Sequence, residues 1–188
     1  MTTAKIPPSV PTEVDWHIHK SQLIIDNYRQ LTAESHLIHN KFKHVWPNRD
    51  SSWTYEMYNV FCLACPMPLW FEMYKELCSV VRDYVDHKDP LWIQSWLNFH
   101  KYGQELEWHG HTAPYHGYVS INPANTTTVF RGYKIENEIG NIYIGPGWRQ
   151  HKVRANEEFD GTRVTLGFDV IDKPENIPNN RWGLIPLL

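Results

Sequence analysis

The stretch from Glu105 to Asn122, ELEWHGHTAPYHGYVSIN, carries the pattern from which the fold is predicted. Its two halves are rich in alternating apolar and polar residues, and the segment Thr112-Ala-Pro114 between them is typical of a turn. The stretch therefore predicts two short β-strands. His109 and His111 stand two positions apart, so a strand that contains both points both side chains to the same face.

The same alternation of strand-like segments and turns continues through the second half of the chain, where short β-type segments are separated by Gly, Pro and Asn. We expect eight strands, over residues 92–101, 105–111, 116–122, 126–130, 133–137, 141–144, 150–154 and 163–170. Eight short strands at this spacing favour a jelly roll. The predicted fold class is therefore mainly β with N-terminal supporting helices, a double-stranded β-helix of the jelly-roll or cupin-like type.

In the first ninety residues, the sequence predicts helices and strands that support this core. Leu69–Asp86 has apolar residues at helical spacing and is the strongest predicted helix. Residues 14–32 indicate a strand followed by a short helix, and Ser51–Cys65 indicates one long strand or two short ones. We expect a single domain over residues 1–188: a flexible tail at 1–12, N-terminal support at 13–90, the β-core at 91–170, and a C-terminal tail at 171–188 that packs on the body.

Composition narrows the class of protein. The formal net charge is −3, so no overall field favours duplex nucleic acid or an anionic membrane. No segment approaches the roughly 18 apolar residues of a membrane span, and residues 1–11 do not resemble a signal peptide. Three cysteines, Cys62, Cys65 and Cys78, make no disulfide framework and favour the reducing cytoplasm. For Cys62 and Cys65, a CxxC pair, we expect buried packing.

The chemistry-bearing residues are His109, His111, His151 and Arg163. His151 follows Gly145-Pro-Gly147, a turn that would place it at the start of a strand. Three histidine ligands leave coordination positions open, as catalysis at a metal requires. Arg163 begins the last predicted strand, where a guanidinium facing the barrel interior suits a carboxylate.

The segments WLN (96–98), WHGH (108–111), GYVSIN (117–122), GNIYIGPGWRQH (140–151) and RVTLGF (163–168) resemble the core of Fe(II)/2-oxoglutarate-dependent oxygenases. The pattern is most similar to small predicted oxygenases encoded by phages and marine bacteria. The resemblance covers about residues 92–170. It implies that His109 and His151 bind iron and that Arg163 binds the distal carboxylate of 2-oxoglutarate, with Tyr118 and Asn98 as candidate hydrogen-bond partners of that cosubstrate.

His111 departs from the family pattern, because the usual facial triad has an Asp or Glu at this place. Two alternatives stay open: His111 is a third ligand, or the site has two histidines completed by water. Glu107 is a weaker candidate ligand, expected on the same strand face as His109. For His116 we expect packing or surface exposure in preference to a place beside the ligands. A second pair, His17 and His19, has the same spacing, but we expect it to be structural or on the surface.

The resemblance implies Fe(II), 2-oxoglutarate and O₂ as cofactors and cosubstrates, and hydroxylation of an unactivated C–H bond in a protein side chain or small molecule. A second hypothesis is a cupin-like three-histidine dioxygenase or isomerase that does not use 2-oxoglutarate. A third is a non-catalytic β-sandwich binding module. The prime substrate and the oligomeric state do not follow from the sequence.

Overall fold

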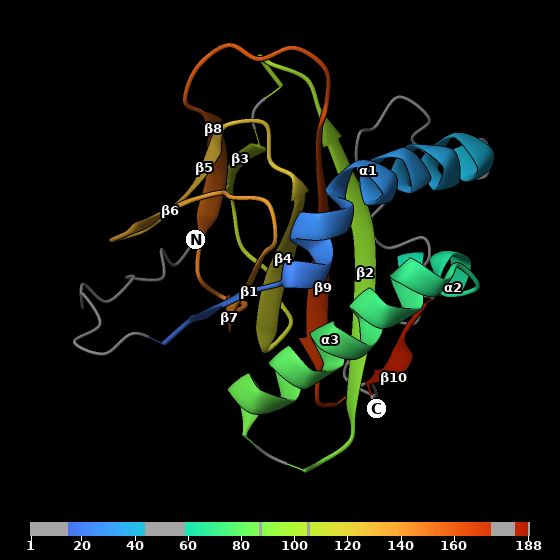
Figure 1. The fold of residues 1–188 in the computed structure, drawn as a ribbon. Helices are drawn as coiled ribbons and strands as arrows, with labels where there is room; N and C mark the ends of the chain where they lie inside the picture. Colours follow the sequence, from blue (N-terminus) through green and yellow to red (C-terminus); the bar gives the residue numbers. More distant parts are fainter. Residues whose placement is uncertain (1–14, 44–58, 87, 105, 174–182, 188) are drawn as a thin grey trace.

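The computed structural model describes residues 15–43, 59–86, 88–104, 106–173 and 183–187. The described elements, in chain order, are β1 (His17–Lys20), α1 (Gln22–Phe42), α2 (Val60–Ala64), α3 (Pro68–Val85), β2 (Leu91–His100), β3 (Leu106–His109), β4 (Tyr115–Asn122), β5 (Thr126–Phe130), β6 (Lys134–Glu136), β7 (Asn141–Pro146), β8 (His151–Ala155), β9 (Arg163–Ile171) and β10 (Ile185–Leu187) (Figure 1). None of the described helices is long and apolar enough to cross a membrane.

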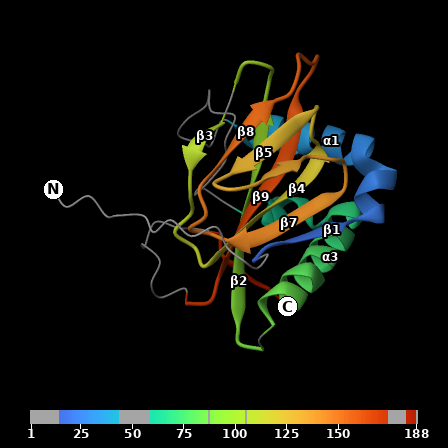
Figure 2. The same cartoon turned by 90° about the vertical axis from the view of Figure 1, so that its left-hand side faces the viewer.

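The strands form two antiparallel sheets. The larger sheet has the order β1-β7-β4-β9-β2-β10, and the smaller has the order β3-β8-β5-β6. Figure 2 shows α1 and α3 on one side of the larger sheet and the smaller sheet on the opposite side. This is the double-stranded β-helix that the sequence predicts.

Strict alternation along the central strands separates an apolar face from a polar one. On β9 the apolar residues Val164, Leu166, Phe168 and Val170 belong to the same hydrophobic cluster as the helices. The intervening residues Arg163, Thr165, Gly167 and Asp169 therefore face the smaller sheet. Because all nine residues of β9 are buried, its polar residues face an interior rather than solvent.

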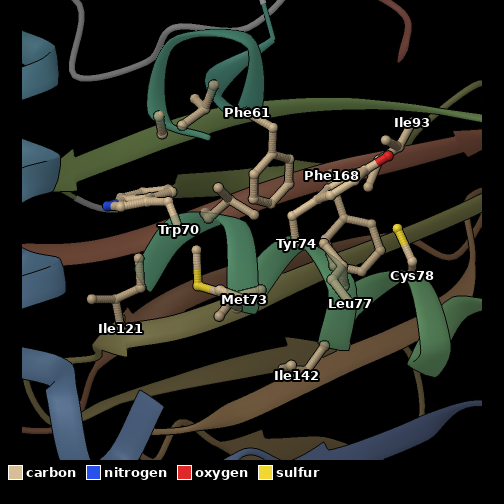
Figure 3. Packing of buried hydrophobic residues seen from close by; sticks show 14 of the residues in the cluster. Phe61, Trp70, Met73, Tyr74, Leu77, Cys78, Ile93, Ile121, Ile142 and Phe168 are labelled. Atoms are coloured by element: carbon tan, nitrogen blue, oxygen red, sulfur yellow. The ribbon is translucent and has the colours of Figure 1, made fainter. Parts of the chain in front are cut away.

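Helix α3 supplies most of the apolar cover on the helical side. Figure 3 shows Trp70, Met73, Tyr74 and Leu77 of α3 packed against strand residues such as Phe168. Trp70, Met73 and Leu77 are fully buried. A fully buried side chain of this size contributes roughly 1.5–3 kcal/mol relative to an exposed one, so this layer anchors the larger sheet.

Most predicted elements agree with the structure to within a few residues. The helix expected at 69–86 is α3, and all eight expected strands are present. Of the predicted C-terminal tail, Ile185–Leu187 packs on the body, since it forms β10, which pairs with β2. The helix expected to be short in the 14–32 region instead runs to Phe42, because buried Leu31, Ser35 and Ile38 continue its inward face.

The strand predicted over Ser51–Cys65 is wrong for residues 60–64, which form α2. The Asn59 side chain accepts a hydrogen bond from the Phe61 N–H and so caps this short helix. Val60, Phe61 and Ala64 are buried on its inner face. A dense apolar run does not distinguish a short helix from a strand without the cap. Residues 51–58, and the tail predicted at 1–12, lie outside the described residues.

Candidate metal centre and ligand cavity

Two neighbouring strands of the smaller sheet carry His109 and His151. His109 ends β3, His151 begins β8, and the two residues are directly opposite in the strand register. His111 lies beyond the end of β3, not within the strand that the sequence predicts. Its backbone N–H donates to the Gly147 carbonyl at 2.9 Å, so the turn before His151 also fixes the position of His111.

The three imidazoles form one cluster. His109, His111 and His151 each offer a nitrogen, and these nitrogens lie within 4.8 Å of one another. The ring of His109 is tilted 64° to that of His111 and 57° to that of His151. Their spacing therefore suits a single metal ion.

Each ring is oriented through Nδ1. His109 Nδ1 donates to the Glu107 carbonyl at 2.7 Å, and His151 Nδ1 donates to the Arg149 carbonyl at 3.3 Å. His111 Nδ1 lies 3.1 Å from Oδ1 of Asp169. A proton on Nδ1 places the lone pair on Nε2, so all three rings share the tautomer in which Nε2 binds a metal.

Burial keeps two of these rings neutral. It lowers the pKa of His109 from its ordinary value and lowers that of His151 well below it. The neighbouring histidines add to the effect on His151, because a second positive charge in the cluster is unfavourable. Neutral imidazole is the form that binds a metal, so these two rings are ready for one at neutral pH.

Glu107 does not join this cluster, which corrects the expectation that it shares a strand face with His109. Leu106 pairs with Val153 and His109 pairs with His151, so β3 has one more residue than β8 over this stretch. This bulge puts Leu106 and His109 on the cavity side and leaves the Glu107 side chain exposed.

A carboxylate that the sequence reasoning missed stands behind His111. Asp169 of β9 is fully buried, and its Oδ1 also accepts a hydrogen bond from His116 Nδ1 at 3.0 Å. Burial raises the pKa of Asp169, but the hydrogen bonds from His111 and His116 outweigh it and hold that pKa below its usual range. The signal that points to Asp169 is its even spacing from Arg163 on β9, which puts both side chains on one face.

His116 is buried, so of the two expected roles, packing and surface exposure, the structure shows packing, but it also places His116 directly beside the candidate ligand His111. It lies opposite Asp169 in the register between β4 and β9, and its ring stacks on His111 at a centroid distance of 3.5 Å. Burial lowers the pKa of His116 to about 4, with the neighbouring His111 also lowering it. His116 is therefore neutral at pH 7 and packs against a candidate ligand.

Arg163 lies in the same cavity as the histidines and is 4% exposed. Its Nε donates to Thr126 Oγ1 at 3.3 Å, and its Nη1 donates to His100 Nδ1 at 3.2 Å. Burial lowers the pKa of Arg163 to about 10, so the guanidinium is still charged at neutral pH. Among the described residues no carboxylate lies within 4 Å of it, which leaves a buried cation without a counter-ion.

Polar side chains line the cavity between the histidines and Arg163. Tyr118 and Asn98, the two predicted hydrogen-bonding residues, both face it. The hydroxyls of two lining residues, Tyr118 and Thr165, are buried and have no hydrogen-bond partner among the described residues. Buried polar groups are rarely left unsatisfied, so this row is suited to a polar ligand.

The pair His17 and His19 lies outside this cluster, on β1 at the edge of the larger sheet. His17 is exposed, and His19 Nε2 lies 2.9 Å from Glu76 Oε1 of α3. This agrees with the expected structural or surface role. The identical spacing does not produce a site here because no further histidine of the described residues joins the pair.

Comparisons with known proteins give a fold but no family. No family model matches the chain, and no curated protein matches it. Among solved structures, the non-heme α-ketoglutarate-dependent epimerase SnoN from nogalamycin biosynthesis is similar at 9% identity and a TM-score of 0.57, covering 84% of this chain and 78% of that one.

Two further structures match smaller parts of the chain. The α-ketoglutarate-dependent carbocyclase SnoK, also from nogalamycin biosynthesis, has 9% identity and a TM-score of 0.46 over 56% of this chain and 59% of that one. A cupin-2 domain protein from Shewanella frigidimarina has 22% identity and a TM-score of 0.33 over 41% of this chain and 69% of that one. With its two antiparallel sheets and its likeness to SnoN, the chain has the double-stranded β-helix fold.

Proposed function

We propose that this protein is an Fe(II)- and 2-oxoglutarate-dependent oxygenase that hydroxylates an unactivated C–H bond of a protein side chain or small molecule. The observation that carries the proposal is one cavity with two chemically different ends. His109, His111 and His151 converge at one end, and Arg163, a buried cation without a described counter-ion, lies at the other. A metal-chelating dicarboxylate needs both.

The residues present fit the iron. His109, His111 and His151 would bind it through Nε2, because each Nδ1 is already turned to an acceptor. Imidazole is a suitable ligand for iron, and three protein ligands leave open positions for a cosubstrate and O₂. With 2-oxoglutarate and O₂, the bound iron would supply an oxidant strong enough to attack a C–H bond, while 2-oxoglutarate becomes succinate and CO₂.

The residues at the other end fit the cosubstrate. Arg163 would hold its distal carboxylate by charge-assisted hydrogen bonds, and burial would strengthen them. The unpartnered hydroxyls of Tyr118 and Thr165, together with Asn98, would supply further hydrogen bonds along the cavity. Trp96 packs beside His111 and His116 and would keep water from this side of the metal.

A second candidate is a cupin-like three-histidine dioxygenase or isomerase that does not use 2-oxoglutarate. The observation that favours it is His111, which stands where the usual triad has a carboxylate. Arg163 discriminates between the two candidates, because the second has no need of a buried cation in this cavity. A non-catalytic binding module, the third hypothesis, requires neither metal nor cosubstrate.

The decisive experiment adds Fe(II) and then 2-oxoglutarate to the untagged protein without oxygen and follows the visible absorption. A charge-transfer band that requires both additions, and succinate formation once O₂ is admitted, are the expected results. Iron binding without any effect of 2-oxoglutarate would favour the three-histidine alternative. Failure to bind any divalent metal would overturn both enzymes and leave the binding module.

We further propose a cytoplasmic protein related to the predicted oxygenases of phages and marine bacteria. The chain has three cysteines, Cys62, Cys65 and Cys78, an odd number that makes no dense disulfide framework, which supports a reducing compartment. The net charge of −3 supports a peptide or metabolite over duplex nucleic acid as the prime substrate. Turnover of 2-oxoglutarate that rises on addition of one substrate class would identify that class.

A further inference from the structure

Two overlapping groups of metal-capable residues share His111. One is His109, His111 and His151, and the other is His111, His116 and Asp169. The second group has two histidines and one carboxylate, which is the composition of the usual iron triad. The two groups are therefore alternative sites for one metal ion, and the orientation of their rings distinguishes between them.

Ring geometry excludes the second group. A metal ion lies close to the plane of each imidazole that binds it, because the nitrogen lone pair lies in that plane. The rings of His111 and His116 are parallel to within 8° and their centroids are 3.5 Å apart. Rings this close can only be stacked face to face, so no single point lies in both planes.

The first group does not have this obstacle. The plane of His109 is steeply tilted to those of His111 and His151, so the planes intersect. His111 and His151 are also parallel to within 8°, but their centroids are 5.5 Å apart, so the two rings are not in face-to-face contact as His111 and His116 are. Binding through Nε2 also preserves the contact between His111 Nδ1 and Asp169.

A three-histidine site lacks the negative charge of a ligating carboxylate, and here a carboxylate lies behind one of the three histidines instead of among the ligands. Asp169 is fully buried, and its Oδ1 contacts Nδ1 of both His111 and His116. A carboxylate behind a ligating histidine fixes the ring and raises its basicity, and losing such a partner typically weakens metal binding about 10- to 100-fold.

We propose that Asp169 is a positioning residue of the metal centre: it holds His111 through Nδ1, with His116 as the stacked support, and supplies the charge that a ligating carboxylate gives elsewhere. This inference rests on the proposed metal centre of His109, His111 and His151. It does not depend on the use of 2-oxoglutarate or on the substrate.

The test is Co(II) binding to the apoprotein, measured by competition with a chelator and by the visible ligand-field spectrum. Asp169→Asn keeps an oxygen acceptor of the same size but removes the charge. We expect its Co(II) dissociation constant to rise about 10- to 100-fold and its spectrum to shift, at a temperature where the apoprotein is folded. Asp169→Ser serves as a second variant if Asp169→Asn does not fold.

Glu76→Gln is the matched control. Glu76 makes the same kind of carboxylate–histidine contact, 2.9 Å from His19 Nε2, outside the histidine cluster. We expect this variant to bind Co(II) like the parent protein. A residue with only a structural role would lower the apoprotein's unfolding midpoint and leave the Co(II) affinity and spectrum of the folded molecules unchanged.

The results distinguish a failure of the proposed role of Asp169 from a failure of the proposed metal centre itself. Loss of Co(II) binding in His109→Ala and His151→Ala, with unchanged affinity and spectrum in Asp169→Asn, would overturn the role of Asp169 alone. Retention of binding in His109→Ala, with complete loss in Asp169→Asn and His116→Ala, would place the metal in the other group. That result would overturn the proposed centre as well.

Discussion

Replacement of Arg163 by methionine separates binding function from stability in this cavity. The guanidinium is 4% exposed and has no described carboxylate within 4 Å, so its charge is a cost to the folded apoprotein. Burial lowers its pKa from 12.5 to about 10, which corresponds to an unfavourable free energy of about 3 kcal/mol.

Methionine fills a similar space without charge and recovers that cost. It also removes the hydrogen bonds to Thr126 and His100, each worth about 1 kcal/mol. We therefore expect the apoprotein of Arg163→Met to be about 1 kcal/mol more stable than the parent, or equal to it. Loss of an arginine from an established buried ion pair would instead cost about 3–5 kcal/mol.

Two assays check this prediction. Urea unfolding of the metal-free proteins measures stability, and anaerobic titration of the Fe(II) form with 2-oxoglutarate measures affinity. Truncating one partner of a buried charge pair costs roughly 2–5 kcal/mol, so affinity should fall by at least about 30-fold. Arg163→Lys keeps a charge but not the planar fork and should retain part of the affinity. A variant that is several kcal/mol less stable yet binds 2-oxoglutarate normally would refute the reasoning.

Three further predictions concern the surroundings of the site. A Cβ on Gly167 would lie 2.6 Å from the Trp96 ring, so Gly167→Ala should lower the free energy of unfolding in urea by about 1–3 kcal/mol. The same substitution should weaken Co(II) binding, because it pushes the indole toward the histidines. An unchanged unfolding free energy and an unchanged Co(II) affinity would contradict this packing. Burial lowers the pKa of His100 to about 4, so below pH 6.5 the unfolded state takes up a proton more readily than the folded state. The free energy of unfolding should fall by up to about 3 kcal/mol between pH 6.5 and 4 on this account, and His100→Gln should lose less over that range; an equal loss in both proteins would exclude His100 as a cause. The double variant His17→Ala and His19→Ala should bind Co(II) like the parent, and weaker binding would show that this pair contributes to the metal site.

The sequence by itself determined the β-core and pointed to the residues that line the candidate site. Alternation fixed the strands because one face of the larger sheet packs on helices and the other lines the cavity, and it put Arg163 on the cavity side. The turn at Gly145–Gly147 placed His151 at the start of a strand as predicted. These features are local, so a period of two residues is enough to read them.

Only the tertiary structure decided which carboxylate contacts the histidines. A bulge in β3 turned Glu107 to solvent, and a bulge depends on pairing with a distant strand. Asp169 reaches His111 because β9 pairs with β4 and β4 brings His116 to the same point. Position 169 is far from 111 in the chain, and only the register between strands brings their side chains within 3.1 Å.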